Sequence, residues 1–227
     1  MAVVTPDLPE IFEEAFERAG LEMRSGYDLK TARRSLNILT LEWQNRGLNL
    51  FTIASGTQSL TAGTATYTMP TDTIDLVEHT IRTGSGTSQL DTNVSRISVS
   101  TYAQKSNKNV QGKPTQVFIQ RLAGSTTVTL HPVPDSSSYT LAYYRLKGID
   151  SLSSGIAGTT TSYVPQRFVP SLVSGLAYYI AMKRPEVASR VPALKQEYEF
   201  QFELVAGEDA ETASIKFVPY NTFYTSA

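Results

Sequence analysis

The sequence predicts an α+β protein. N- and C-terminal helices form a helical bundle, an antiparallel β-sandwich or barrel-like domain is inserted between them, and an extended tail follows. Near both ends of the 227-residue chain, apolar residues recur at steps of three and four, which is typical of amphipathic helices. The central region has short runs of alternating apolar and polar residues separated by Gly, Asn, Asp and Ser, which is typical of antiparallel strands. A chain of this length can bury a substantial core.

The first predicted helix covers residues 6–19. Pro6 suits its first turn, and Gly20 can end it. Its glutamates lie outside the apolar stripe, and the early ones are favoured by the positive end of the helix dipole. The stripe consists of Ile11, Phe12, Ala15, Phe16 and Ala19.

Residues 28–53 contain the transition from helix to sheet, and we expect both ends of the chain to return to it. An apolar stripe follows about five turns of predicted helix, with Asp28 placed to cap the start. Gly47 can take the left-handed conformation that ends the helix, and alternation begins after it. We therefore predict that Trp43 and Gly47 form a structural joint. The stripe consists of Leu29, Ala32, Leu36, Leu39 and Trp43.

Residues 50–147 predict short strands with turns between them. Residues 83–86 and 123–125 predict hairpin turns, and residues 98–105 predict a short helix. Residues 148–163, rich in Gly, Ser and Thr, have little to bury, and so long a loop is usually functional or mobile. In an assembly it would face a lumen or clasp a neighbour. The strands are predicted at 50–54, 57–61, 65–69, 74–83, 88–92, 115–122, 126–131 and 139–147.

Helices return at Pro165. One predicted helix extends to Arg184, where Pro185 breaks it, and a last helix begins at Pro192. The stripes are Phe168, Leu172, Leu176 or Tyr179, and Ile180 in the first helix, and Leu194, Tyr198, Phe202 and Val205 in the second.

These elements predict a division of the chain into domains. Residues 1–49 and 164–206 form the helical bundle domain, residues 50–163 form the β-rich insertion domain, and residues 207–227 form the extended tail.

The tail carries aromatic residues without a helical or strict β period. Burying four of them, at about 150–250 Å² each and ~25 cal/mol/Å², would contribute roughly 15–25 kcal/mol. Ordering about fifteen residues costs roughly 15–25 kcal/mol. Because the two nearly cancel, we predict a tail that is loose in an isolated monomer and ordered by a partner or by its own oligomer. The predicted interface residues are Phe217, Tyr220, Phe223 and Tyr224.

Composition argues against several classes of protein. The chain has no cysteine, which excludes disulfides, thiolate nucleophiles and cysteine metal sites. A net charge of −1 argues against a dedicated nucleic-acid binder, because neutralising phosphates needs a clustered positive excess. The N-terminus lacks the pattern of a signal peptide, and residues 168–182 are too short to span a bilayer. We expect a soluble protein made inside the cell.

No residue pattern predicts a catalytic, cofactor-binding or metal-binding site. His79 and His131 lack the spacing of metal ligands, and the chain has no GxSxG motif. The glycines at 84–86 and at 112 lack the spacing of phosphate-binding loops.

One ordered set of motifs begins with residues 32–50, ARRSLNILTLEWQNRGLNL. The set spans roughly residues 8–206. As a whole, it resembles the head-to-tail adaptor (head-completion or tail accessory) proteins of short-tailed bacteriophages. The further motifs are residues 51–53, 67–70, 75–76, 97–102, 112–114 and 130–134, the strand at 143–144 and the helix at 176–184.

The resemblance implies a non-enzymatic ring, commonly of twelve copies, beneath the portal. Such a ring extends the DNA channel and gives the tail nozzle a platform. The implied partners are further copies of the chain, the portal protein, the tail nozzle or tube protein, and DNA that passes through the lumen without sequence-specific binding. No membrane, metal or cofactor is implied, and the location is the head–tail junction of the virion. The aromatic tail would contact the portal or a neighbouring subunit.

Other functions fit parts of the sequence. A virion-associated cell-wall hydrolase would use exposed carboxylates, first Glu13 or Glu17, and would lose wall lysis on Glu→Gln substitution. A single-stranded-DNA-binding module would use Arg121 and Arg145 with nearby aromatics, and its affinity would fall steeply with salt. A minor capsid or tail-fibre-junction protein is a further structural alternative.

Overall fold

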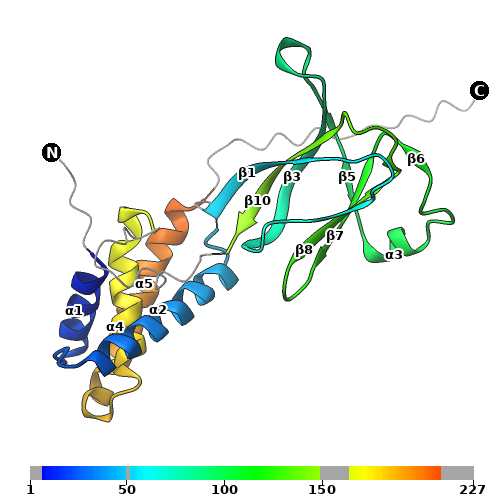
Figure 1. Cartoon of the computed structure of the whole chain (residues 1–227). Helices are drawn as coiled ribbons and strands as arrows, with labels where there is room; N and C mark the ends of the chain where they lie inside the picture. The colour runs from blue at the N-terminus through cyan, green and yellow to red at the C-terminus, as the bar shows by residue number, and fades with distance from the viewer. Residues whose placement is uncertain (1–6, 50–51, 149–163, 211–227) are drawn as a thin grey trace, which may run out of the picture.

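The computed structural model describes residues 7–49, 52–148 and 164–210. The molecule is elongated, with helices at one end and strands at the other (Figure 1). The predicted α+β fold class is confirmed, because helices from both ends of the described chain accompany mainly antiparallel sheets. We call α1, α2, α4 and α5 the helical part, and the strands with α3 the β part. The predicted domain boundaries stay a prediction.

Helix α1 (Leu8–Ala19) buries its predicted stripe against the rest of the helical part. Its start is fixed by a capping box, in which the backbone N–H of Asp7 donates to Glu10 Oε2 at 2.9 Å. Its end is fixed by Gly20, whose φ is +82° and whose N–H donates to carbonyl oxygens of the last turn. Both ends are therefore set by residues close in sequence.

Helix α2 (Gly26–Asn45) begins earlier than predicted, because Ser25 is the N-cap and not Asp28. Ser25 Oγ accepts a hydrogen bond from the Asp28 N–H at 3.3 Å, and Asp28 Oδ2 accepts one from the Ser25 N–H at 3.1 Å. Asp28 also pairs with Arg184, which follows α4. Gly47 has a φ of +90°, so the chain leaves α2 through the left-handed conformation that the sequence predicts there.

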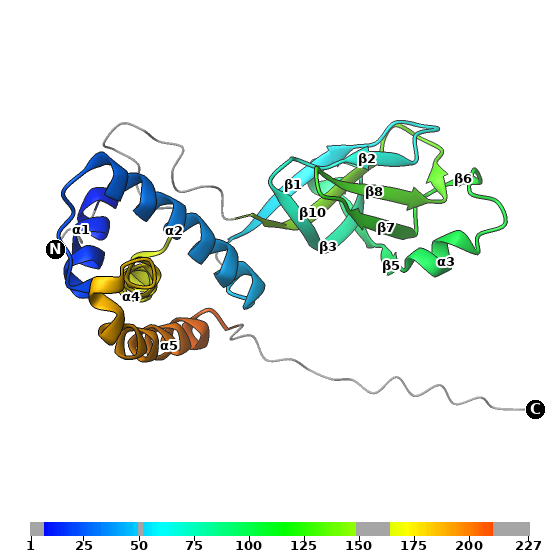
Figure 2. The ribbon, with the colours of Figure 1, turned by 90° about the horizontal axis from the view of Figure 1, so that it is seen from below.

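Helix α4 (Val169–Ala181) lies at the centre of the helical part. Helices α1, α2 and α5 (Val191–Glu208) pack around it, and Figure 2 shows it between α2 and α5. A glycine permits this close packing, since a Cβ atom at Gly175 would lie 2.8 Å from the Tyr198 ring and 2.9 Å from Leu39. Short 3-10 turns flank α4, namely η3 (Gln166–Phe168) and η4 (Pro185–Arg190).

The described strands of the β part form two four-stranded sheets and one two-stranded sheet. The first sheet has the order β1-β10-β3-β4, the second β2-β8-β7-β5, and the small one pairs β6 with β9. Pairing is antiparallel except between β5 and β7 and between β6 and β9. The strands are β1 (Ile53–Ser59), β2 (Thr66–Thr68), β3 (Thr73–Thr83), β4 (Leu90–Asn93), β5 (Ser95–Ile97), β6 (Gln111–Gly112), β7 (Gln116–Arg121), β8 (Thr126–His131), β9 (Val133–Pro134) and β10 (Thr140–Lys147), with η2 (Gly86–Ser88) before β4 and α3 (Val99–Ala103) after β5.

One apolar core lies between the two larger sheets. In the first sheet Ile81 pairs with Leu141, and in the second Val117 pairs with Leu130; all four side chains are buried. Ile81 and Leu141 alternate with half-buried residues, as the period of two requires. The second sheet also buries Phe118 and Thr129, the sequence neighbours of Val117 and Leu130. The sheets therefore form a sandwich.

Two details of the sheets differ from the sequence prediction. The strands expected at 50–54 and 57–61 are one strand, β1, because Ser55 and Gly56 continue the pairing with β10. Strands β5, β6 and β9 were not predicted, since two or three residues show no readable alternation and acquire their pairing from distant segments. Strand β1 pairs with β10, so the chain enters and leaves the β part side by side.

Candidate assembly interface

Trp43 connects α2 with α5 inside the helical part. Its indole is fully buried, and Nε1 donates a hydrogen bond to the hydroxyl oxygen of Tyr198 at 3.1 Å. Phe202 packs on the same indole, with 6.5 Å between the ring centroids. Burial raises the pKa of Tyr198, so its hydroxyl stays protonated. The bond sets the spacing of α2 and α5 in the last turn of α2 before the chain turns toward β1.

Arg46 holds the same end of α2 from the outside. It donates to Glu42 at 3.2 Å and to Glu199 of α5 at 2.6 Å, and its guanidinium carbon lies 3.6 Å from the centre of the Phe202 ring. Tyr179 of α4 donates to the other oxygen of Glu42 at 2.7 Å. Three helices are thus tied together where the helical part ends. That Trp43 and Gly47 act as a structural joint stays a prediction.

An open cleft lies where α2 meets the β part. Leu41 and Gln44 line one side of it, and two stretches of the β part, residues 71–74 and 121–126, line the other. The lining mixes the hydrocarbon side chains of Leu41, Ile74 and Leu122 with polar and charged groups, and Asp72 is the one carboxylate among these lining residues. The cleft is therefore the boundary between the helical part and the β part, without the paired acids of a hydrolase site.

Asp72 fixes the turn that enters this cleft. Arg145 donates to its carboxylate and also to Thr73 Oγ1 at 2.9 Å, while Lys147 Nζ lies 3.8 Å from the carboxylate. The Gly148 N–H donates to the Asp72 carbonyl oxygen at 2.7 Å. The hydrogen bond from Arg145 holds the pKa of Asp72 below its ordinary value, although burial opposes this. These contacts hold the turn at Asp72, which precedes β3, against the end of β10.

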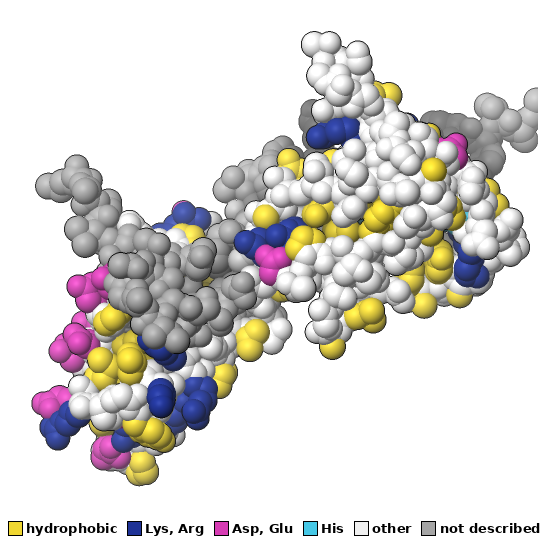
Figure 3. Space-filling view, in the orientation of Figure 1, with side chains coloured by type: hydrophobic (Ala, Val, Ile, Leu, Met, Phe, Trp, Pro, Cys, Tyr) yellow, Lys and Arg dark blue, Asp and Glu magenta, His cyan; other side chains and the backbone are white. Residues whose placement is uncertain are grey.

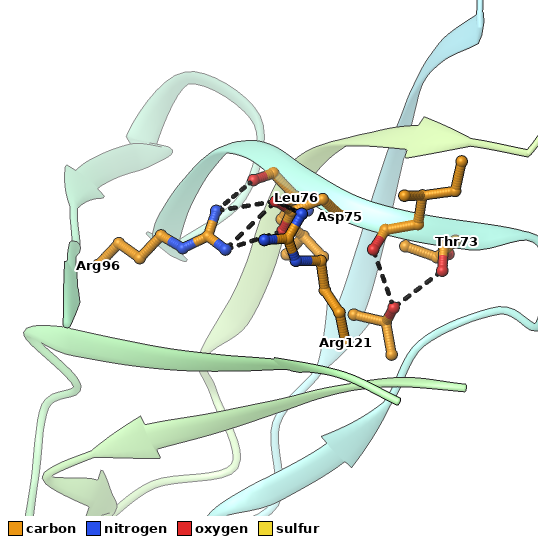
Figure 4. A network of polar contacts seen from close by, with 7 residues as sticks. Thr73, Asp75, Leu76, Arg96 and Arg121 are labelled. Atoms are coloured by element: carbon orange, nitrogen blue, oxygen red, sulfur yellow. Dashed lines mark hydrogen bonds and ion pairs between the residues drawn. The ribbon is translucent and has the colours of Figure 1, made fainter. Parts of the chain in front are cut away.

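A second polar cluster joins the two sheets (Figure 4). Asp75 of β3 accepts a hydrogen bond from Arg96 of β5 at 3.2 Å, and Arg121 of β7 lies 3.6 Å from the same carboxylate. Nearby, the Thr126 hydroxyl donates to the carbonyl oxygen of Thr73 at 2.8 Å. Arg96 and Arg121 therefore share a single carboxylate of the same molecule, which offsets one of their two positive charges.

The aromatic residues of the sheets do not form an open stacking surface. Phe118 is buried under Tyr102 of α3, with their rings stacked at 4.9 Å, and Tyr143 is buried in the core. Tyr144 is exposed beside them in sequence. A single-stranded-DNA-binding sheet would need a row of free aromatic rings beside unpaired basic side chains. The described strands have no such row, and Arg121 and Arg145 are paired with acids.

The other candidate chemical residues stay dispersed. His79 is buried in β3, where burial lowers its pKa, and His131 lies in β8 of the other sheet. Glu13 and Glu17 are exposed on α1. Residues 7–49, 52–148 and 164–210 contain no group of three or more His, Asp or Glu that could hold a metal ion. Nor does any helix in these ranges have the length and apolar character needed to cross a membrane.

Large apolar side chains protrude from two helices, a feature that the sequence analysis missed. Ile38 and Leu41 of α2 are 45% and 56% exposed, and Phe200 and Leu204 of α5 are 55% and 56% exposed. Figure 3 shows yellow hydrophobic side chains over α2, next to a group of Lys and Arg. The signal was in the sequence, since all four residues lie off the stripe that each helix buries.

The interface residues predicted from the sequence, Phe217, Tyr220, Phe223 and Tyr224, lie outside the described residues. A lumen-facing or neighbour-clasping place was expected for the loop at 148–163. Residues 149–163 of this loop lie outside the described residues too.

Comparison with known proteins supplies one match. The sequence model of a protein family described as SU10 adaptor protein matches residues 10–216. No curated protein matches the chain.

Proposed function

Because the chain belongs to the SU10 adaptor protein family, a family of phage head–tail adaptors, we propose that it is the subunit of a ring that connects the portal to the tail. The ring extends the DNA channel of the head and provides the platform on which the tail attaches. The subunit acts as a structural part of the virion at the head–tail junction and performs no catalytic step.

The extent of the family match carries this proposal. The match covers residues 10–216, so it includes both sheets and nearly all of the helical part. A short shared motif would support only a local likeness. A match that follows the whole order of helices and strands supports a shared architecture and, with it, a shared structural role.

The shape of the molecule is compatible with a connector. Helices occupy one end and the β-sandwich occupies the other (Figure 1), so the two ends offer surfaces of different chemistry. A connector needs this difference, because the portal and the tail are different partners. We propose that the helical part faces the portal and that the β part faces the tail.

The finer features of the proposal follow the adaptor resemblance. The ring holds twelve copies with cyclic symmetry. Phe217, Tyr220, Phe223 and Tyr224 contact the portal or a neighbouring subunit and become ordered there. DNA passes through the lumen without sequence-specific binding, and a net charge of only −1 gives its phosphates little electrostatic attraction to the chain.

Native mass spectrometry of the full chain, alone and mixed with its portal, tests the proposal. We expect the mixture to contain a portal-bound complex with about twelve copies of the chain, as one closed cyclic ring requires. A chain that remains monomeric and does not bind an intact portal ring would overturn the connector function.

A further inference from the structure

The outward face of α2 changes chemistry along its length. At about 100° of rotation per residue, Lys30, Arg34, Ile38 and Leu41 fall within about a quarter of the helix circumference, opposite its buried side. Lys30 and Arg34 occupy the N-terminal half of this stripe, and the two apolar side chains occupy the C-terminal half. The face is therefore basic at one end, where the exposed Tyr27 also lies, and apolar at the other, where Leu41 borders the cleft toward the β part.

The positive charge of this face is not neutralised by α2 itself. Its acidic residues, Asp28 and Glu42, are already in ion pairs with arginines outside the helix. Lys183, which donates to Ser35 on the buried side of α2, adds a positive charge near Arg34, and burial together with the charge of Arg34 lowers the pKa of Lys183. An approaching partner with acidic groups would therefore be attracted to this end of the helix.

The outward face of α5 also combines exposed apolar side chains with charge, but its charge is negative and its layout differs. Phe200 and Leu204 protrude one turn apart, and the exposed Glu197 and Glu203 flank them. The basic residue of α5, Lys195, lies about 140° around the helix from Phe200. This face is therefore apolar along its centre and acidic along its margins.

The two faces point away from each other. The buried sides of α2 and α5 both turn toward α4, which lies between them in Figure 2. The hydrogen bond from Trp43 to Tyr198 and the ion pair of Arg46 with Glu199 hold the two helices in this arrangement. One molecule thus offers two complementary faces in different directions, which is the requirement for a head-to-tail contact between copies.

We propose that the α2 face of one molecule docks on the α5 face of a second copy of this chain. Contact between two α2 faces would bring like charges together, so the contact is heterologous. This contact would be the lateral contact between subunits of the ring proposed above. Only the closure of the contacts into a ring rests on that proposed function. The α2 face consists of Lys30, Arg34, Ile38 and Leu41. The α5 face consists of Glu197, Phe200, Glu203 and Leu204.

The absence of cysteine from the chain allows a direct test by disulfide cross-linking of the full-length protein. Two single variants, Ile38→Cys and Phe200→Cys, each place one thiol on one face. We expect no cross-linked product from either variant alone, a disulfide-linked dimer from their mixture, and a ladder of multimers from the double variant. Cross-linking is suited to this contact, because two helix faces would fall at the low end of the ~1,200–2,000 Å² that stable interfaces bury.

Val99→Cys is the matched control, since Val99 is exposed on α3 in the β part, remote from both faces. It should not cross-link to Ile38→Cys. Charge reversal supplies a second control. Lys30→Glu with Arg34→Glu in the Ile38→Cys protein should abolish the dimer, and Glu197→Lys with Glu203→Lys in its Phe200→Cys partner should restore it.

Dimers of Ile38→Cys with itself, or equal cross-linking to Val99→Cys, would overturn this pairing of faces. The two proposals also fail separately. A portal-bound ring that forms without the cross-link would remove the interface and leave the connector function. A cross-link that forms in a protein unable to bind the portal would support the interface and remove the connector function.

Discussion

The helical part and the β part of this protein are stabilised in different ways. The helical core buries large aromatic side chains completely, among them Phe12, Phe16 and Trp43, around one central helix. The β core is built mostly from aliphatic side chains, and its sheets are joined as well by a charged cluster around Asp75. The comparison teaches that lost side-chain volume should weaken the helical part more than the β part, in which charged contacts also hold the sheets together.

The same two parts differ in how they use their surface charges. In the β part, Arg121 and Arg145 are paired with acids of the same molecule. In the helical part, the basic face of α2 and the acidic face of α5 each lie beside exposed apolar side chains. Charges that are satisfied internally stabilise a fold, whereas complementary charges on separate faces are available to a partner. The proposed contact between copies therefore lies in the helical part.

The largest effect is expected from Trp43→Ala. The substitution empties a fully buried site and removes the donor to Tyr198, so the free energy of unfolding should fall by about 3–5 kcal/mol. Urea unfolding followed by helical circular dichroism would measure the change. Tyr144→Ala, which truncates an exposed side chain of the β part, is the control and should change stability by less than about 0.5 kcal/mol. Equal effects would contradict the comparison.

A smaller effect is expected from Gly175→Ala in α4. The new Cβ atom would lie under 3 Å from both Tyr198 and Leu39, and such overpacking costs about 1–3 kcal/mol of unfolding free energy. Gly207→Ala in α5 is the matched control, because nothing lies within 4 Å of its Cβ position. That variant should be more stable by about 0.5–1 kcal/mol. Stabilisation by both substitutions would show that α4 is not closely packed.

The smallest effect is expected from Asp72→Asn in the β part. The loss of the charge partner of Arg145 should lower the unfolding free energy by about 1–2 kcal/mol at neutral pH. Because the folded-state pKa of Asp72 is lowered, its contribution is present above the unfolded value of about 3.9 and disappears as pH falls through the folded value.

The native protein should therefore lose stability with acid more steeply than the Asp72→Asn variant over this range, as urea unfolding at a series of pH values would show. Asp91→Asn breaks the more exposed pair with Arg82 and is the comparison, because solvent screening weakens such pairs. A larger loss for Asp91→Asn at neutral pH would contradict the assignment of Asp72 as the stabilising carboxylate.

The amino-acid sequence by itself determined the local features of this protein. The stripes of α1 and α2 follow from apolar spacing, and the end of α2 follows from Gly47, because both depend on residues within a few turns of one another. The α+β class follows from the change of period between the ends and the middle of the chain. The adaptor resemblance also came from motifs that are readable in order.

Tertiary structure decided what depends on residues far apart in the chain. The partner of Trp43 is Tyr198, 155 residues away. The short strands β5, β6 and β9 likewise find their partners outside their own local sequence, since Ser95 pairs with Gln116 and Gln111 with Val133. The exposed faces of α2 and α5 were also decided by tertiary structure. Period shows which residues share one side of a helix, but only packing around α4 decides which side is buried, which is left open and where the open side points.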